Sequence, residues 1–77
     1  MTNEQFPTVQ GVAATIAGNV RNILRSQEHD LEWLADQIDI SASTILKHFT
    51  YGVPAWLTLD MANVLDVPAG DIIEGVA

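Results

Sequence analysis

The chain has 77 residues, of which 48% are hydrophobic and 17% are charged, and 10 acidic against 3 basic residues give a net charge of -7. This length fits one domain, and the apolar content excludes an intrinsically disordered chain. The absence of cysteine excludes disulfides and thiolate metal sites. No apolar run approaches the roughly 20 residues that span a bilayer, and the N-terminus lacks the basic start of a signal peptide, so we expect a soluble, cytoplasmic protein.

The N-terminal residues 1–7 are polar and show no periodicity, so we expect a flexible arm there, followed by a single domain over residues 8–77. From residue 8 onward the apolar side chains recur with a helical period, which predicts a long first helix. Its apolar positions are Val9, Val12, Ala13, Ile16, Ala17, Val20, Ile23 and Leu24.

Two short helices are expected next, each preceded by a residue suited to N-capping. Asp30 precedes a helix predicted over residues 31–39, and Ser41 precedes one predicted over residues 42–50. In both cases the side-chain oxygen can accept hydrogen bonds from the free amides of the first turn.

The C-terminal third begins with Gly52 and Pro54, which predict a loop that also contains Tyr51, Val53 and Trp56. Thr58 is expected to cap a fourth helix. The buried stripe of that helix is predicted to be Leu59, Ala62 and Leu65, with Met61 beside it. A last short helix is expected over residues 71–75. No segment alternates with a period of two, so the sequence predicts an all-α fold of five helices.

The segment over residues 34–49, LADQIDISASTILKHF, together with the later LDMANVLDVPAGDII, resembles the phage repressor and Cro type of helix-turn-helix domain. The match is to a pattern of residue types over roughly residues 20–74. Its most specific parts are Leu34-Ala35, Ile40-Ser41, Ser43-Thr44-Ile45, and Ala62 with Leu65 and Val67. The resemblance implies a compact, lambda-repressor-like domain in which the second and third helices form the helix-turn-helix.

The same resemblance implies that the third helix reads DNA bases in the major groove from its first turn, with a further contact one turn later. The candidate DNA-binding residues are Ser41, Ala42, Ser43, Thr44, Lys47, Arg21, Arg25 and Tyr51. Lys47 suits guanine acceptors or a phosphate, the hydroxyls suit several bases, and the Ala42 methyl suits a thymine methyl. Capping alone is an equally good interpretation of Ser41, and exposed hydroxyls such as Ser43 and Thr44 are usually just solvated.

The chain departs from this family where DNA phosphates are normally held. Leu31 stands where a polar residue, often glutamine, commonly begins the second helix, and the loop TYGVPAW contains no basic residue. Only Arg21, Arg25 and Lys47 supply side-chain cations, so we expect weak, salt-sensitive DNA binding. Tight binding would require a dimer, adjacent sites or a partner.

The acidic residues have two interpretations. Some are expected at caps and first turns, where they stabilise helices; these are Asp30, Glu32, Asp60 and Asp71. Others are free to cluster on a face away from DNA; these are Glu28, Asp36, Asp39 and Asp66.

Self-association is expected because a core of this size rarely supplies more than about 3–5 kcal/mol. The candidate interface residues are Trp33, Trp56, Ile73 and Val76, and the alternative for both tryptophans is that they fold inward onto the core.

The sequence therefore favours a dimeric, sequence-specific transcriptional regulator that binds an operator in double-stranded DNA. The alternative is an acidic helix-turn-helix module that binds a protein, as an antirepressor or co-regulator does. No catalytic, metal or cofactor site is expected, because His29 and His48 lack ligand spacing and there is no glycine-rich phosphate loop.

Overall fold

Residues 9–75 are described by the structure, a computed structural model, and over this range the chain forms five helices and no strand. The helices are α1 (Val9–Ser26), α2 (Leu31–Ile38), α3 (Ala42–Tyr51), α4 (Ala55–Leu65) and α5 (Ala69–Ile73). The expected all-α class is confirmed. The predicted arm over residues 1–7 and the candidate interface residue Val76 lie outside the described residues.

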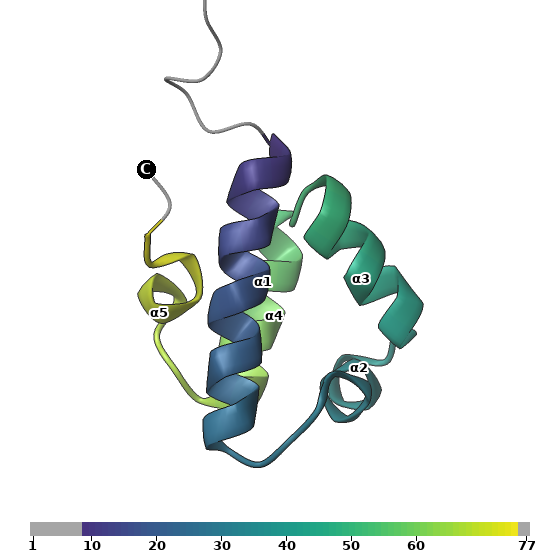
Figure 1. The fold of residues 1–77 in the computed structure, drawn as a ribbon. Helices are drawn as coiled ribbons and strands as arrows, with labels where there is room; N and C mark the ends of the chain where they lie inside the picture. Colours follow the sequence, from purple (N-terminus) through teal and green to yellow (C-terminus); the bar gives the residue numbers. More distant parts are fainter. Residues whose placement is uncertain (1–8, 76–77) are drawn as a thin grey trace, which may run out of the picture.

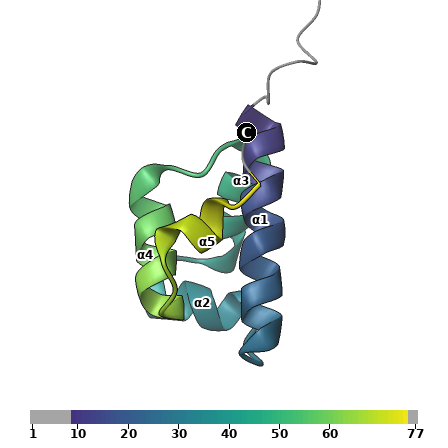
Figure 2. The same cartoon turned by 90° about the vertical axis from the view of Figure 1, so that its left-hand side faces the viewer.

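The long helix α1 is the element around which the others are arranged. It packs against α3, α4 and α5, while α2 packs against α3 and α4. In Figure 1, α3 and α5 lie on opposite sides of α1 and α4 lies behind it. Figure 2 shows α2 near the C-terminal end of α1. This arrangement leaves one side of α3 facing away from the rest of the molecule.

The core is built from one face of each helix. Its largest fully buried side chains are Val20, Leu34, Ile45, Leu57, Met61, Leu65 and Ile72. On α1, the apolar period identified in the sequence is confirmed by the burial of Ala13, Ile16, Val20 and Leu24. Burial of each large aliphatic side chain stabilises the fold by about 1.5–3 kcal/mol.

Two of the three expected N-caps are confirmed. The Asp30 carboxylate accepts a hydrogen bond of 2.8 Å from the Trp33 amide, and the Ser41 hydroxyl accepts one of 3.1 Å from the Thr44 amide. Each cap satisfies an amide of the first turn that has no partner within its helix. These two bonds fix where α2 and α3 begin.

The expected start of α4 is wrong. The helix begins at Ala55, with Pro54 in the N-cap position, so Trp56 lies in its first turn and not in a loop. Proline can open a helix because its missing N–H has no intrahelical partner there. Thr58 is a buried residue inside the helix, and its hydroxyl donates to the Pro54 carbonyl at 3.3 Å.

The buried side of α4 also differs from the expected one. The buried positions are Leu57, Thr58, Met61, Ala62 and Leu65. Leu59 is 54% exposed, contrary to the expectation that it belongs to the buried stripe. Asp60 lies beyond the first turn, which contains no acidic residue. The last helix, α5, likewise begins two residues before its expected start, after Pro68.

Three helices are followed, within two residues of their last turn, by an acidic residue in the left-handed region. These residues are Glu28 (φ 63°), Asp39 (φ 69°) and Asp66 (φ 59°). After each of them the next amide bonds back to a carbonyl five residues earlier, as in the bond of 2.9 Å from His29 to Leu24. This is the Schellman arrangement, in which glycine is the usual left-handed residue. It lets the chain leave each helix sharply.

Two side chains of α1 and the turn after it hold the C-terminal half in place. The Asn19 amide group donates to the carbonyls of Ile72 (2.9 Å) and Glu74 (2.7 Å), and the Gln27 amide group donates to the Leu65 carbonyl (2.8 Å). These bonds tie the ends of α4 and α5 to α1. Within the described range, no helix combines the length and apolar character needed to cross a bilayer.

Candidate functional site

The connection between α2 and α3 consists of the residues Asp39, Ile40 and Ser41. Asp39 ends α2, and its amide donates to the carbonyls of Ala35 (2.8 Å) and Asp36 (3.3 Å). Ile40 packs against the core, and Ser41 then caps α3. In Figure 1, α2 is seen along its axis and α3 from the side, so the two helices cross steeply.

One face of α3 is turned to solvent. Its residues recur at helical spacing and are Ser43, Leu46, Lys47 and Thr50, all of them exposed. The opposite face buries Ile45 and Phe49 in the core. We call the exposed set of four residues the solvent face of α3. Lys47 makes no hydrogen bond or ion pair with any residue of the described range, so its ammonium group is available to an external acceptor.

The first turn of α3 carries three hydroxyl groups in contact. The Ser41 oxygen lies 3.0 Å from the Ser43 hydroxyl oxygen and 2.8 Å from that of Thr44. Ser41 is committed to capping, whereas Ser43 is exposed and Thr44 is half-buried. Ala42 is also half-buried and packs against the core, which leaves less of its methyl group for a ligand. Ser43 and Lys47 are therefore the most accessible of the expected base-reading residues.

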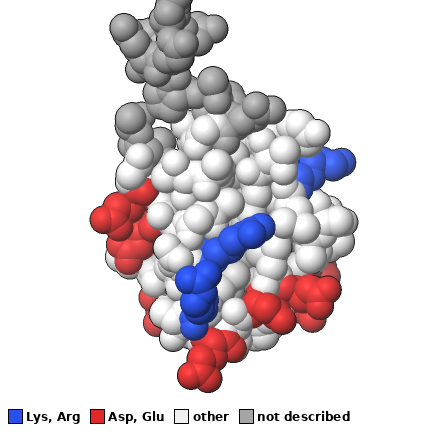
Figure 3. All heavy atoms as spheres, in the orientation of Figure 1, with Lys and Arg blue, Asp and Glu red and all other residues white. Residues whose placement is uncertain are grey.

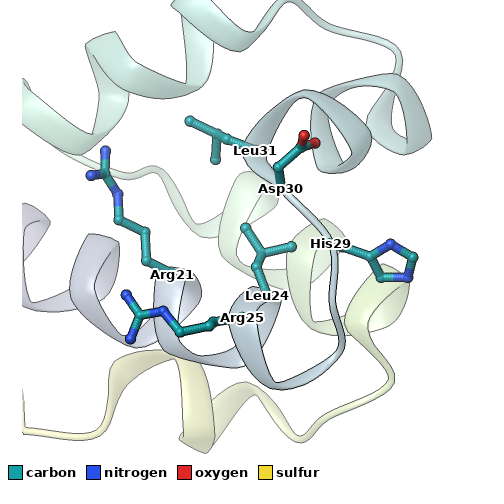
Figure 4. Close-up of a pocket in the computed structure, with 6 residues that line it drawn as sticks. All are labelled: Arg21, Leu24, Arg25, His29, Asp30 and Leu31. Carbon is teal, nitrogen blue, oxygen red and sulfur yellow. The ribbon is translucent and has the colours of Figure 1, made fainter.

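The two arginines line an open pocket of about 450 Å³ between α1 and the start of α2. Figure 4 shows Leu24 and Leu31 within it and the Arg21 and Arg25 side chains extending from α1, whereas the His29 ring points away. Arg25 donates one side-chain hydrogen bond, to Asn22 at 3.4 Å, and the Arg21 guanidinium has no hydrogen-bond or ion-pair partner among the described residues. Both guanidinium groups are thus free of carboxylates, although Asp30 also lines the pocket.

A second, smaller hollow of about 220 Å³ lies where α2 meets the start of α3. It is lined by Glu32 and Asp36 as well as by Ser41 and Ala42. Asp36 is therefore close to the candidate DNA-binding residues and not on a remote face. Two carboxylates here oppose the approach of a phosphate to the first turn of α3.

The surface charge shows the same mixture over a wider area. In Figure 3, Lys and Arg spheres are visible at two places, over α1 and at the edge near α3, with uncharged surface between them. Asp and Glu spheres lie along the lower part of this face and at its left side. The molecule therefore shows no continuous basic surface on this side.

The candidate interface residues differ in their surroundings. Trp56 on α4 is 49% exposed, although its ring also meets the His48 ring edge-on at 6.0 Å. Trp33 is half-buried, packs against the core and stacks in parallel on the His29 ring at 3.6 Å. Ile73 is exposed, as is Tyr51 at the end of α3. The alternative that the tryptophans fold inward onto the core thus describes Trp33 better than Trp56.

Sequence reasoning did not identify Leu46 and Thr50 as part of the exposed side of α3. The signal was present, because a helical period counted from the buried Ile45 and Phe49 places Leu46 and Thr50 outside the buried stripe. Across the described residues no group of three or more His, Cys, Asp or Glu side chains is placed to hold a metal ion. No protein-family model, curated protein or solved structure matches this chain.

Proposed function

We propose that this protein is a sequence-specific DNA-binding transcriptional regulator of the repressor type, with α2 and α3 acting as a helix-turn-helix. The observation that carries the proposal is the solvent face of α3, which follows a turn of three residues and on which the Lys47 ammonium group has no partner among the described residues. In a helix-turn-helix, the second helix of the pair lies in the major groove and the first crosses the DNA backbone.

The chemistry of the exposed groups supports this role. Lys47 can donate to guanine O6 and N7, and the Ser43 hydroxyl can pair with several base edges. Arg21 and Arg25, at the pocket beside the start of α2, are placed to neutralise phosphates of the backbone that α2 would cross. Three cations per protomer limit the slope of log affinity against log salt to about 3, so a dimer on a two-fold operator would bind far better than a monomer.

The test is a selection of binding sequences from random duplex DNA at low salt, followed by affinity measurements on the enriched sequence. We expect Lys47→Ala to weaken binding by about tenfold, the value of one good base contact. Asn63→Asp on α4 is the matched control, because it lowers the net charge by the same amount on another exposed helix position. Failure to enrich any sequence, or equal affinities for wild type and Lys47→Ala, would overturn the proposal.

A second candidate function is favoured by the acidic hollow at the start of α3. Glu32 and Asp36 beside Ser41 and Ala42 would suit a cationic segment of a protein partner better than a phosphate. In that case the protein acts as an antirepressor or co-regulator. Neutralising Glu32 and Asp36 distinguishes the two candidate functions. A DNA-binding protein should then bind DNA more tightly, whereas a protein-binding module should bind a basic peptide more weakly.

A further inference from the structure

Leu46 is an exposed leucine on the otherwise polar solvent face of α3. Its side chain is 42% exposed and does not belong to the apolar residues packed against the core. Ser43, Lys47 and Thr50 surround it at helical spacing on the same side of the helix. A single exposed leucine is common on protein surfaces, but this one lies among the groups that would enter the major groove.

We propose that Leu46 reads the C5-methyl group of a thymine, so that each half-site of the operator contains a thymine at the position facing Leu46. The inference rests on the proposed function and adds part of the base preference to it. Thymine is the base that offers an apolar group in the major groove, next to its O4 acceptor. An isobutyl group has no donor or acceptor, so opposite any other base edge it would leave a polar atom desolvated and unpaired.

The neighbouring groups are less suited to this contact. The Ala42 methyl is half-buried and packs against the core. The Thr50 hydroxyl is already hydrogen-bonded to the Leu46 carbonyl at 2.9 Å, and Ser43 and Lys47 end in polar atoms. Leu46 therefore supplies the largest apolar contact on the solvent face of α3.

The experiment replaces each thymine of the selected operator, one at a time, by uracil, which lacks only the methyl group. At one position per half-site we expect the wild-type protein to lose about three- to fivefold in affinity, the effect of one buried methyl. Leu46→Ala should bind the thymine operator several-fold more weakly than wild type, and it should not distinguish thymine from uracil at that position.

Leu59→Ala is the matched control, because Leu59 is an exposed leucine on α4 and should keep the wild-type sensitivity to uracil. Thermal unfolding of both variants checks that the fold is retained. If the protein binds a specific operator but wild type and Leu46→Ala respond equally to every uracil, or the half-site has no thymine, the inference is overturned while the proposed function stands. If no operator is enriched at all, both fail.

Discussion

Glu28, Asp39 and Asp66 each place a side chain at a backbone position that favours glycine. A residue with a Cβ pays a steric cost in the left-handed region, and Asn or Asp tolerates this region better than Glu does. Each carboxylate also lies at the C-terminal end of a helix, where the helix dipole disfavours negative charge. Both effects reduce the stability of the folded state.

Glu28→Gly should raise the free energy of unfolding by about 1 kcal/mol, because it removes the strain and the unfavourable charge at the end of α1. The gain for Asp66→Gly should be smaller, since Asp suits this conformation better. Urea denaturation measures both. Glu74→Gly is the control, because the φ of Glu74 is -58° and glycine has no advantage there. A Glu28→Gly variant no more stable than wild type would show that the left-handed position carries no strain.

At the level of elements, α5 depends on its contacts with the rest of the fold. A helix of five residues is not stable by itself in water. Burial of Ile72 and the hydrogen bonds from Asn19 to the carbonyls of Ile72 and Glu74 hold it against α1. The side chain of one α1 residue therefore controls the position of the C-terminal segment.

Asn19→Ala should lower the free energy of unfolding by about 1–3 kcal/mol, because it leaves the half-buried Ile72 carbonyl without its donor. Hydrogen exchange should show the largest loss of protection at the amides of α5. Asn22→Ala, also on α1, should change stability by less than about 0.5 kcal/mol, since Asn22 is exposed and its side chain accepts a single, long hydrogen bond from Arg25. Uniform loss of protection across all helices would contradict a local role for Asn19.

The helix boundaries show which elements the sequence could predict. Asp30 and Ser41 cap α2 and α3 as expected, because a capping side chain acts on amides only a few residues away. For α4 the sequence offers two possible N-caps, Pro54 and Thr58. The helix begins after Pro54, so Thr58 lies inside it. Leu57 and Thr58 lie before the first residue of the expected helix, so the expected stripe does not include them. With Met61 and Leu65 they define a buried side that excludes Leu59.

The candidate site was predictable only in part. The exposure of Ser43 and Lys47 follows from the period of α3, and Leu46 is identified by the same period. The closeness of Asp36 to Ser41 and Ala42 depends on how the turn at Asp39 folds α2 against α3. That arrangement is tertiary, so no pattern within a single helix could show it.

At the scale of the whole molecule, Glu32 and Asp36 place two negative charges beside the start of α3. The double variant Glu32→Gln and Asp36→Asn should strengthen binding to the selected operator by about three- to tenfold at low salt, and by less as salt screens the charges. Fluorescence anisotropy at several salt concentrations measures this change.

The control is the double variant Asp71→Asn and Glu74→Gln, which alters the net charge equally around α5, on the other side of α1 from α3 (Figure 1). We expect a smaller gain from it, because these groups are farther from the proposed DNA-binding face of α3. Equal gains from the two double variants would mean that net charge alone governs affinity. A loss of affinity in the α2 variant would assign the acidic hollow a direct contact with DNA.

The left-handed acidic residues also bear on how this protein can change by mutation. Aspartate and glutamate codons become glycine codons through a single base substitution, so each of the three helix ends at Glu28, Asp39 and Asp66 is one such step from glycine. Random mutagenesis followed by selection for resistance to heat should therefore recover these glycine substitutions early. At Asp39, the same step would also remove a carboxylate from the turn before α3, so selection for heat resistance alone should yield variants that bind DNA more tightly.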